Sequence, residues 1–349
     1  MRIIEKISNE NRTVKNLVDD RRSGNLIVDQ SFQRNYVWGP KDQVKLIETI
    51  LLGYSIPEIY LYNQTVNPDT GDMTTSIIDG QQRIGAVYDY INDEFSLNAR
   101  YLSNSSSSYA NKMFSELTVE EKKIIWSYPF TARVINFNIE REYIVELFLR
   151  LNATDKTLNP QELRNAEFNG EFIKQAEKIS NFNFWKEIFS SSRIRRMADI
   201  EFISQILIYF RFGIDSDLNQ TAINKAYDTF NEIYEKKDED FNRFKAIIYV
   251  LEELSKSKVI LDFMKKVTHL YTIIIVVDYL TNIKNINILQ ESVMLKNIEE
   301  FSYYVIGDER HKDNAVLNEY LELSLEGTRR KSNRLRRINL MKKFVLEGF

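Results

Sequence analysis

The spacing of hydrophobic residues changes character part-way along the chain. Up to about residue 138, short apolar runs that suit strands alternate with amphipathic stretches that suit helices. Beyond that point, apolar residues recur almost throughout at helical intervals. We therefore expect an α+β protein, with a small mixed α/β domain over residues 1–138 and a largely helical domain over residues 139–349.

The first part of the chain is predicted to contain helices that alternate with short strands. Helices are expected over residues 14–22, 41–52, 81–92 and 119–126, and strands over 26–28, 59–62, 73–78 and 131–137. Turn-forming residues, among them Pro68 and Gly71, separate two of these strands, so residues 59–78 are predicted to form a hairpin. The second part is predicted to contain helices over residues 161–178, 195–209, 222–234, 241–254 and 261–280.

The composition agrees with a globular, helix-rich protein. The chain has 349 residues, of which 43% are hydrophobic and 28% charged, values that allow a sizeable core. Only 11 Gly and 5 Pro occur, which argues against a loop-rich all-β fold. The absence of Cys excludes disulfides, thiolate zinc sites and cysteine nucleophiles. With only His269 and His311, the chain alone cannot build catalysis that needs two or three imidazoles.

No segment of the sequence is typical of a membrane protein. The longest strongly apolar run covers residues 271–277, whereas a membrane-spanning helix needs about 20 apolar residues. The first residues lack the apolar stretch of a signal peptide. We expect a soluble, cytoplasmic protein without a membrane partner. A net charge of −3 excludes a generic polyanion binder, although the C-terminal end is strongly basic.

The segment from Asp79 to Arg83, Asp-Gly-Gln-Gln-Arg, lies where a strand is expected to run into a helix. The first turn of a helix offers unpaired backbone amides and a positive dipole end, which together form an anion site. Arg83 suits phosphate, Asp79 suits Mg²⁺ or a hydroxyl proton, and the amides of Gln81 and Gln82 suit a phosphate oxygen or a water molecule. The pattern alone slightly favours a structural alternative, a capping box between Asp79 and Gln82.

Residues 32–38, Phe-Gln-Arg-Asn-Tyr-Val-Trp, form a second candidate segment between a strand and a helix. Gln33 and Arg34 can contact a phosphate or a base, and the neighbouring aromatic residues can stack on bases. In the alternative interpretation the aromatic residues anchor the loop to the core and Arg34 is solvated. Taken alone, the segment favours this alternative.

A third candidate lies where one helix is expected to end and another to begin. Asn159 is a suitable N-cap, with Pro160 in the first helical position. In the functional interpretation, Asn152, Gln161 and Glu162 face the same cleft as Asp79. Alternatively, Glu162 and Arg164 form a surface pair that contributes little to stability.

The fourth candidate is the basic C-terminal stretch, in which an apolar stripe at helical spacing accompanies the charges. A basic amphipathic helix of this kind can lie along a nucleic-acid backbone. A docking helix with a charged outer face, neutralised by the acidic residues 232–240, explains the pattern equally well. The candidate nucleic-acid-binding residues are Arg329, Arg330, Lys331, Arg334, Arg336 and Arg337.

Three of these segments, taken in order and spacing, resemble the N-terminal domain family of GmrSD-type restriction endonucleases over roughly residues 10–215. They are residues 32–38, residues 78–83 (Ile-Asp-Gly-Gln-Gln-Arg) and the pair Arg-Leu-Asn at 150–152 with Leu-Asn-Pro-Gln-Glu-Leu-Arg-Asn-Ala at 158–166. The resemblance implies a ParB/sulfiredoxin-like fold followed by helices, and a nucleoside triphosphate bound and hydrolysed at the Asp-Gly-Gln-Gln-Arg motif. It also implies a role in prokaryotic defence against phage, often directed at modified DNA.

Carried onto this sequence, the resemblance assigns catalysis to the motif residues and nucleotide binding to residues around them. The expected catalytic residues are Asp79, Gln81, Gln82 and Arg83, with Asp79 also binding Mg²⁺. The expected nucleotide-binding residues are Gln33, Arg34, Gly80, Arg83, Asn152, Gln161 and Glu162.

The resemblance does not extend to a nuclease domain. Full-length enzymes of this kind carry a second domain of the His-Asn-His type, whereas residues 216–349 contain only His269 and His311. We therefore expect a Mg²⁺-dependent nucleoside triphosphatase that acts with DNA and a separate nuclease or defence subunit, and homo-oligomer formation stays open. The alternatives are a DNA endonuclease acting through the ParB-like domain and a non-enzymatic, nucleotide-gated DNA-binding module.

Overall fold

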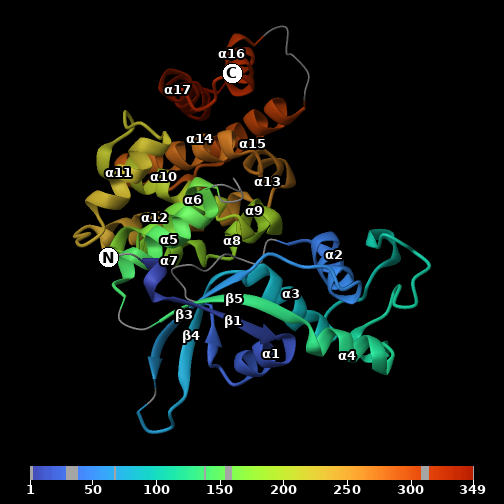
Figure 1. Ribbon diagram of the computed structural model, residues 1–349. Helices are drawn as coiled ribbons and strands as arrows, with labels where there is room; N and C mark the ends of the chain where they lie inside the picture. The colour runs from blue at the N-terminus through green and yellow to red at the C-terminus, as the bar shows by residue number, and fades with distance from the viewer. Residues whose placement is uncertain are drawn as a thin grey trace. The chain divides into compact units, whose positions relative to one another are not determined.

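The structure is a computed structural model that describes residues 3–28, 38–66, 68–136, 139–153, 159–307 and 314–348. The chain divides into two compact units, Met1–Glu167 and Phe168–Phe349 (Figure 1). The change of pattern near residue 138 therefore marks the end of the last strand. The first compact unit continues beyond it through two further helices.

The first unit is built on a mixed five-stranded sheet with the strand order β1-β5-β3-β4-β2. The strands are β1 Ile7–Thr13, β2 Leu26–Ile27, β3 Ile59–Val66, β4 Met73–Asp79 and β5 Pro129–Ile135. The predicted hairpin is confirmed, because β3 and β4 pair antiparallel. β3 also pairs with β5 and β4 with β2, both in parallel. β1 was not predicted, since its sequence Ile-Ser-Asn-Glu-Asn-Arg-Thr has almost no apolar residues.

Helices cover both faces of this sheet. One face packs against α1 Val14–Arg22, α2 Pro40–Leu51, α3 Gln81–Ile91 and α4 Val119–Ser127 (Figure 1). Each of these four helices was predicted. The strands present alternate apolar residues to that core, as period-2 geometry requires. The opposite face carries a smaller cluster with α5 Arg141–Ala153 and α6 Pro160–Glu167, in which Ile78 and Ala166 both take part.

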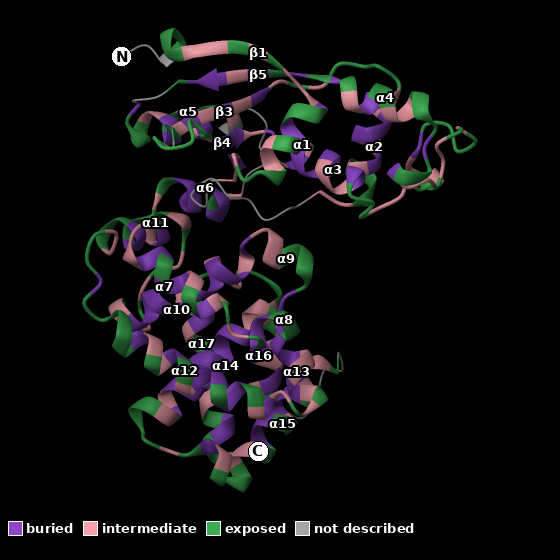
Figure 2. Cartoon of the chain, turned by 90° about the horizontal axis from the view of Figure 1, so that it is seen from below, coloured by how far each residue is buried: buried purple, intermediate pink, exposed green. Residues whose placement is uncertain are grey.

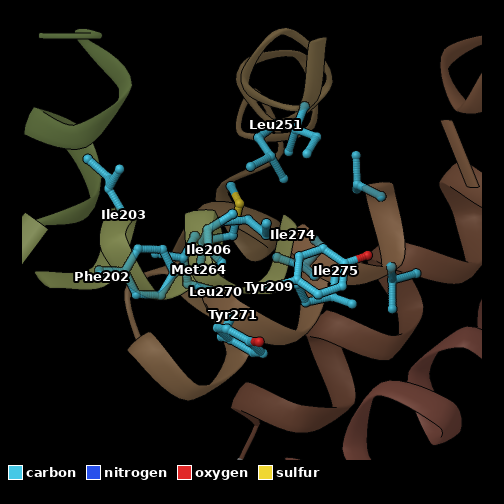
Figure 3. Packing of buried hydrophobic residues seen from close by; sticks show 14 of the residues in the cluster. Phe202, Ile203, Ile206, Tyr209, Leu251, Met264, Leu270, Tyr271, Ile274 and Ile275 are labelled. Carbon is cyan, nitrogen blue, oxygen red and sulfur yellow. The ribbon is translucent and has the colours of Figure 1, made fainter. Parts of the chain in front are cut away.

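The second unit is helical in all its described parts. Its α-helices are α7 Glu171–Ser180, α8 Phe184–Ile188, α9 Ser191–Arg195, α10 Ala198–Phe212, α11 Gln220–Thr229, α12 Lys237–Leu254, α13 Lys258–Met264, α14 Val267–Asp278, α15 Ser292–Ile306, α16 Ala315–Leu325 and α17 Lys331–Glu347. Every residue of α14 from His269 onward is buried, and Figure 2 shows this helix in purple among its neighbours. Figure 3 shows α14 packed with residues of α10, α12 and α13. Among the described residues, no helix is both long and apolar enough to cross a membrane.

Two of the long predicted helices are each divided in two. The helix expected over residues 161–178 is interrupted before Gly170, the N-cap of α7. A Cβ on Gly170 would lie 2.1 Å from the backbone oxygen of Asn231, so only glycine fits there. The helix expected over residues 261–280 is interrupted at Lys265 and Lys266. In both places the apolar periodicity continues across the break, and periodicity alone therefore could not reveal it.

Candidate functional site

The junction between β4 and α3 consists of a single left-handed residue. β4 ends at Asp79, Gly80 has φ +97°, and α3 begins at Gln81. A side chain is excluded at Gly80 on two grounds. The left-handed conformation disfavours L-residues, and an added Cβ would lie only 2.5 Å from Cγ2 of Ile59. The motif's glycine thus allows the chain to turn directly from the sheet into the helix.

Asp79 and Arg83 are bound to each other across this turn. Nη2 of Arg83 donates to Oδ2 of Asp79 at 2.8 Å and to the backbone oxygen of Glu58 at 3.1 Å. The Asp79 side chain is 39% exposed and that of Arg83 15%. The capping-box interpretation is wrong, because the N-cap of α3 is Gly80 and not Asp79, and glycine has no side chain that could cap the helix. Asp79 therefore binds Arg83 and does not cap the amides at the start of α3.

Gln82 connects α3 to the chain that precedes α2. Its side chain is buried, and its amide oxygen accepts a hydrogen bond from the backbone N–H of Trp38 at 3.0 Å. Trp38 is the last residue of the second candidate segment. Gln33 and Arg34 of that segment lie outside the described residues. Gln82 thus fixes the end of this segment to the motif.

A row of polar side chains crosses the sheet from the motif. Asp79, Tyr60, Arg133 and Asn9 are register partners on β4, β3, β5 and β1, so they follow one another across the sheet, with an irregularity in the β3–β4 register beside Tyr60. Arg133 donates to Glu58 Oε2 at 2.8 Å and to Asn9 Oδ1 at 2.6 Å, and the Tyr60 hydroxyl donates to Glu58 Oε1 at 2.8 Å. Because Arg83 also contacts Glu58, the row forms a continuous polar network that ends at Asp79.

Charges within this network fix which groups carry protons. The hydrogen bond from Arg133 holds the pKa of Glu58 below its usual range. Burial, together with the Glu58 carboxylate, raises the pKa of Tyr60 to about 12. At neutral pH, Glu58 is therefore an anion and Tyr60 a neutral hydrogen-bond donor. Sequence analysis missed Glu58, Tyr60 and Arg133, although the alternation of polar and core residues along β3 and β5 places such side chains opposite the core.

The start of α6 is a reciprocal cap. Oδ1 of Asn159 accepts from the amides of Gln161 and Glu162, each at 2.9 Å, and Glu162 Oε2 accepts from the Asn159 amide at 2.7 Å. The predicted N-cap is thereby confirmed. The alternative interpretation, a surface pair between Glu162 and Arg164, is wrong, because both residues are buried. Nε of Arg164 donates to the Gln161 side chain at 2.9 Å. Asn152 lies in α5, and its side chain is not among those that the structure describes.

The helix α6 packs on the sheet beside the strand that ends at Asp79. Ala166 of α6 and Ile78, the residue before Asp79, belong to the same buried cluster. The described hydrogen bonds of Gln161 and Glu162 serve α6 itself. The structure thus brings the third candidate segment to the strand that leads into the motif, with its polar residues used at least in part for the helix start.

Residues 14–169 match the family model described as GmrSD restriction endonuclease, N-terminal domain. Over these residues, which make up fewer than half of the 349, the chain is similar to that domain, and we call them the GmrSD domain. The match includes the Asp79–Arg83 motif and the cap at Asn159, and it ends close to Glu167, the last residue of the first unit. The match indicates a component of a restriction-type phage-defence system, with a function related to DNA. Neither a curated protein nor a solved structure matches the chain.

The six basic residues expected to bind nucleic acid lie outside the GmrSD domain and do not form one exposed face. Arg334 and Arg337 are only 3% and 2% exposed, since they point into the second unit. Arg336 is paired with Glu319, with Nη2 to Oε2 at 2.8 Å. Of the six, Arg329, Arg330 and Lys331 are exposed without a described ion pair. The expectation of one basic face on the C-terminal helix is thus wrong for the two buried arginines.

Within the described ranges, neither the GmrSD domain nor the second unit contains a group of three or more Asp, Glu or His side chains placed to hold a metal ion. His269 is buried between the rings of Phe263 and Tyr320, with centroid distances of 4.6 and 5.5 Å. Its Nδ1 lies 3.0 Å from the Tyr320 hydroxyl oxygen. Burial lowers its pKa to about 3, so the ring is neutral and has a structural role.

Proposed function

We propose that the GmrSD domain of this protein binds and hydrolyses a nucleoside triphosphate with Mg²⁺ at the junction of β4 and α3. The observation that carries the proposal is the Gly80 turn, in which the N-cap residue of α3 has no side chain of its own beside Asp79 and Arg83. This is the arrangement in which helix amides and dipole receive a phosphate group.

The phosphate chain is assigned to the first turn of α3 and to Arg83. Because the N-cap is a glycine, it brings no side chain that competes for the amides of that turn. Arg83 is held by Asp79 and by the Glu58 backbone, so its guanidinium is oriented before a ligand arrives. Its buried Nε has no hydrogen-bond partner within the described residues. A preorganised guanidinium stabilises the charge that develops on a transferred phosphoryl group.

Asp79 fits a role at the metal. One of its oxygens binds Arg83, while more than a third of the side chain stays exposed. Mg²⁺ is commonly held by one or two carboxylates together with the phosphates of the substrate, so a single carboxylate suffices when the nucleotide is present. When bound, the ion would neutralise phosphate charge. Gln81, in the first turn, is assigned to orienting the attacking water, and Gln82 to holding the segment that carries Gln33 and Arg34.

The nucleotide-handling unit is proposed to act in a complex with DNA, in which a separate subunit cuts the strand. The relation of the family to restriction supports DNA as the partner. Nucleotide hydrolysis would then control the complex, while recognition and cleavage of DNA involve the other subunit.

The test is phosphate release from ATP, GTP, CTP and UTP with Mg²⁺, in the presence and absence of DNA. We expect Asp79→Ala and Arg83→Ala each to reduce release by about a hundredfold or more, as loss of a transition-state contact does. Asp19→Ala is the matched control, because it removes the acid of an exposed i,i+4 pair with Lys15 on α1. A folded Asp79→Ala protein with wild-type activity would refute the assignment. Nucleotide binding without any release would favour the non-enzymatic module.

A further inference from the structure

A cavity of about 250 Å³ lies within the second unit, between α9, α10, α14 and α17. Four of its lining residues are arginines and none is acidic. We call it the arginine cavity. It is lined by Arg193, Gln205, Leu218, Val267, Thr268, Tyr271, Thr328, Arg329, Arg334 and Arg337.

Two of these arginines are buried cations that bind backbone oxygens instead of carboxylates. Arg334 Nη2 donates to the carbonyl oxygens of Ile214 and Ser216. Arg337 donates to the carbonyl oxygens of Leu323 and Thr328, each at 2.7 Å. The Nε atoms of both are buried and lack a hydrogen-bond partner among the described residues. Burying a charge is costly unless it is paired, so this arrangement needs a compensating anion.

A third donor belongs to the same cavity. The Tyr271 hydroxyl is buried and has no hydrogen-bond partner in the described residues. Burial raises the pKa of Tyr271 to about 12, so its oxygen carries a proton at neutral pH. The guanidinium of Arg334 lies 5.7 Å from the Tyr271 ring centroid. Figure 3 shows this ring at the edge of the apolar cluster around α14.

The rim of the cavity extends the positive charge to the surface. Arg193 and Arg329 line it and are exposed, whereas Asp215 and Asp217, which flank Ser216, are exposed and not part of the lining. Burial lowers the pKa of Arg337, and the nearby charge of Arg334 lowers it further. An anion in the cavity would relieve this repulsion between the two guanidinium groups.

We propose that the arginine cavity binds an inorganic phosphate anion, orthophosphate or pyrophosphate. The lining has the residue types that a phosphate requires, namely arginines and a tyrosine around one cavity without a carboxylate among them. Size selects a small anion, since pockets for larger organic ligands measure about 300–1,000 Å³. This site is separate from the nucleotide site of the GmrSD domain and does not depend on it.

The test is calorimetric titration of the full-length protein with orthophosphate and with pyrophosphate, at an ionic strength kept constant with chloride. Saturable binding of at least one anion is expected. Arg193→Gln and Tyr271→Phe should each weaken it by about tenfold or more, as loss of a hydrogen bond to a charged group does. The same binding should persist in Arg83→Ala, which removes the assigned phosphate contact of the GmrSD motif, so that phosphate held at the motif is not counted.

Tyr209→Phe is the matched control, because its hydroxyl is paired with Asp278 at 2.6 Å and lies outside the cavity. This change should lower the unfolding temperature and leave anion affinity unchanged. Tyr271→Phe should weaken anion binding and should not lower the unfolding temperature, since the hydroxyl that it removes is unpaired among the described residues. The proposal would be overturned if neither anion gave a saturable heat of binding. It would also be overturned if the Arg193→Gln and Tyr271→Phe variants bound the anions as tightly as the wild type. A nucleoside triphosphate that bound this cavity more tightly than both anions would overturn it as well.

Discussion

At the scale of single residues, Gly80 shows how one position sets the geometry of the motif. Its φ of +97° and the 2.5 Å approach of Ile59 are separate obstacles to any other residue. The first obstacle is shared by other left-handed glycines, whereas the second is specific to the contact between the β4–α3 turn and β3. The two can therefore be measured separately by comparing Gly80 with a left-handed glycine in open space.

We expect Gly80→Ala to destabilise the first unit by about 1–3 kcal/mol or more, through backbone strain and overlap with Ile59. Gly71→Ala is the matched control, because Gly71 has φ +75° but no atom within 4 Å of an added Cβ. That change should cost only the backbone part, about 1 kcal/mol. Urea denaturation of both variants gives the comparison, and equal losses would show that the contact with Ile59 is unimportant.

The residue scale also shows the limit of sequence analysis at the site. The motif from Asp79 to Arg83 was identified from its order of residue types and its place between a strand and a helix. The network through Glu58 and Arg133 could not be found in this way, because it depends on the parallel register of β3 and β5. Residues 75 positions apart become neighbours only through that register.

At the scale of elements, local patterns predicted most helices and strands, and the exceptions have identifiable causes. β1 is polar along its length and gains its place by pairing with β5. The breaks before Gly170 and at Lys265 lie inside uninterrupted apolar periodicity, and the first depends on the close approach of Asn231. Tertiary contacts decide the place of β1 and the break before Gly170, and the surrounding sequence does not record them.

The helix α14, which is buried from His269 onward, carries a pH dependence through His269. Because burial lowers its pKa from 6.5 to about 3, the unfolded chain binds one more proton than the folded chain between those values. Stability from this neutral histidine is fully present above pH 6.5 and decreases as the pH falls toward 3. The expected slope is about 1.4 kcal/mol per pH unit.

The measurement is the free energy of unfolding of the second unit by urea at a series of pH values, for wild type and His269→Gln. The wild type should lose its advantage over the variant as the pH decreases, because glutamine does not titrate. Carboxylates titrate alike in both proteins and cancel in the difference. If the difference stayed constant from pH 8 to about pH 4.5, a depressed pKa for His269 would be excluded.

At the scale of the whole molecule, the boundary between the units lies later than the sequence pattern indicates. Strands end near residue 138, yet α5 and α6 bury the second face of the sheet. The helical pattern after residue 138 is real, but its first two helices belong to the first unit. The spacing of apolar residues predicts a helix, but it does not show which core the helix packs against. The change of pattern at residue 138 therefore could not give the boundary between the two units.

The boundary can be tested by comparing two fragments, residues 1–167 and residues 1–138. The longer fragment keeps α5 and α6, and with them the apolar cluster that contains Ile78, Ile135, Ile144 and Phe148. The shorter one exposes Ile78 and Ile135 to water, next to the Asp79–Arg83 motif. Exposing a buried isoleucine costs about 1.5–3 kcal/mol, which is a large share of the roughly 5–15 kcal/mol that stabilises a domain.

We expect the 1–167 fragment to unfold cooperatively in urea and to bind the same nucleotide as the full chain, and the 1–138 fragment to do neither. Cooperative unfolding of the 1–138 fragment at the same urea midpoint would show that α5 and α6 are not part of the first unit's core.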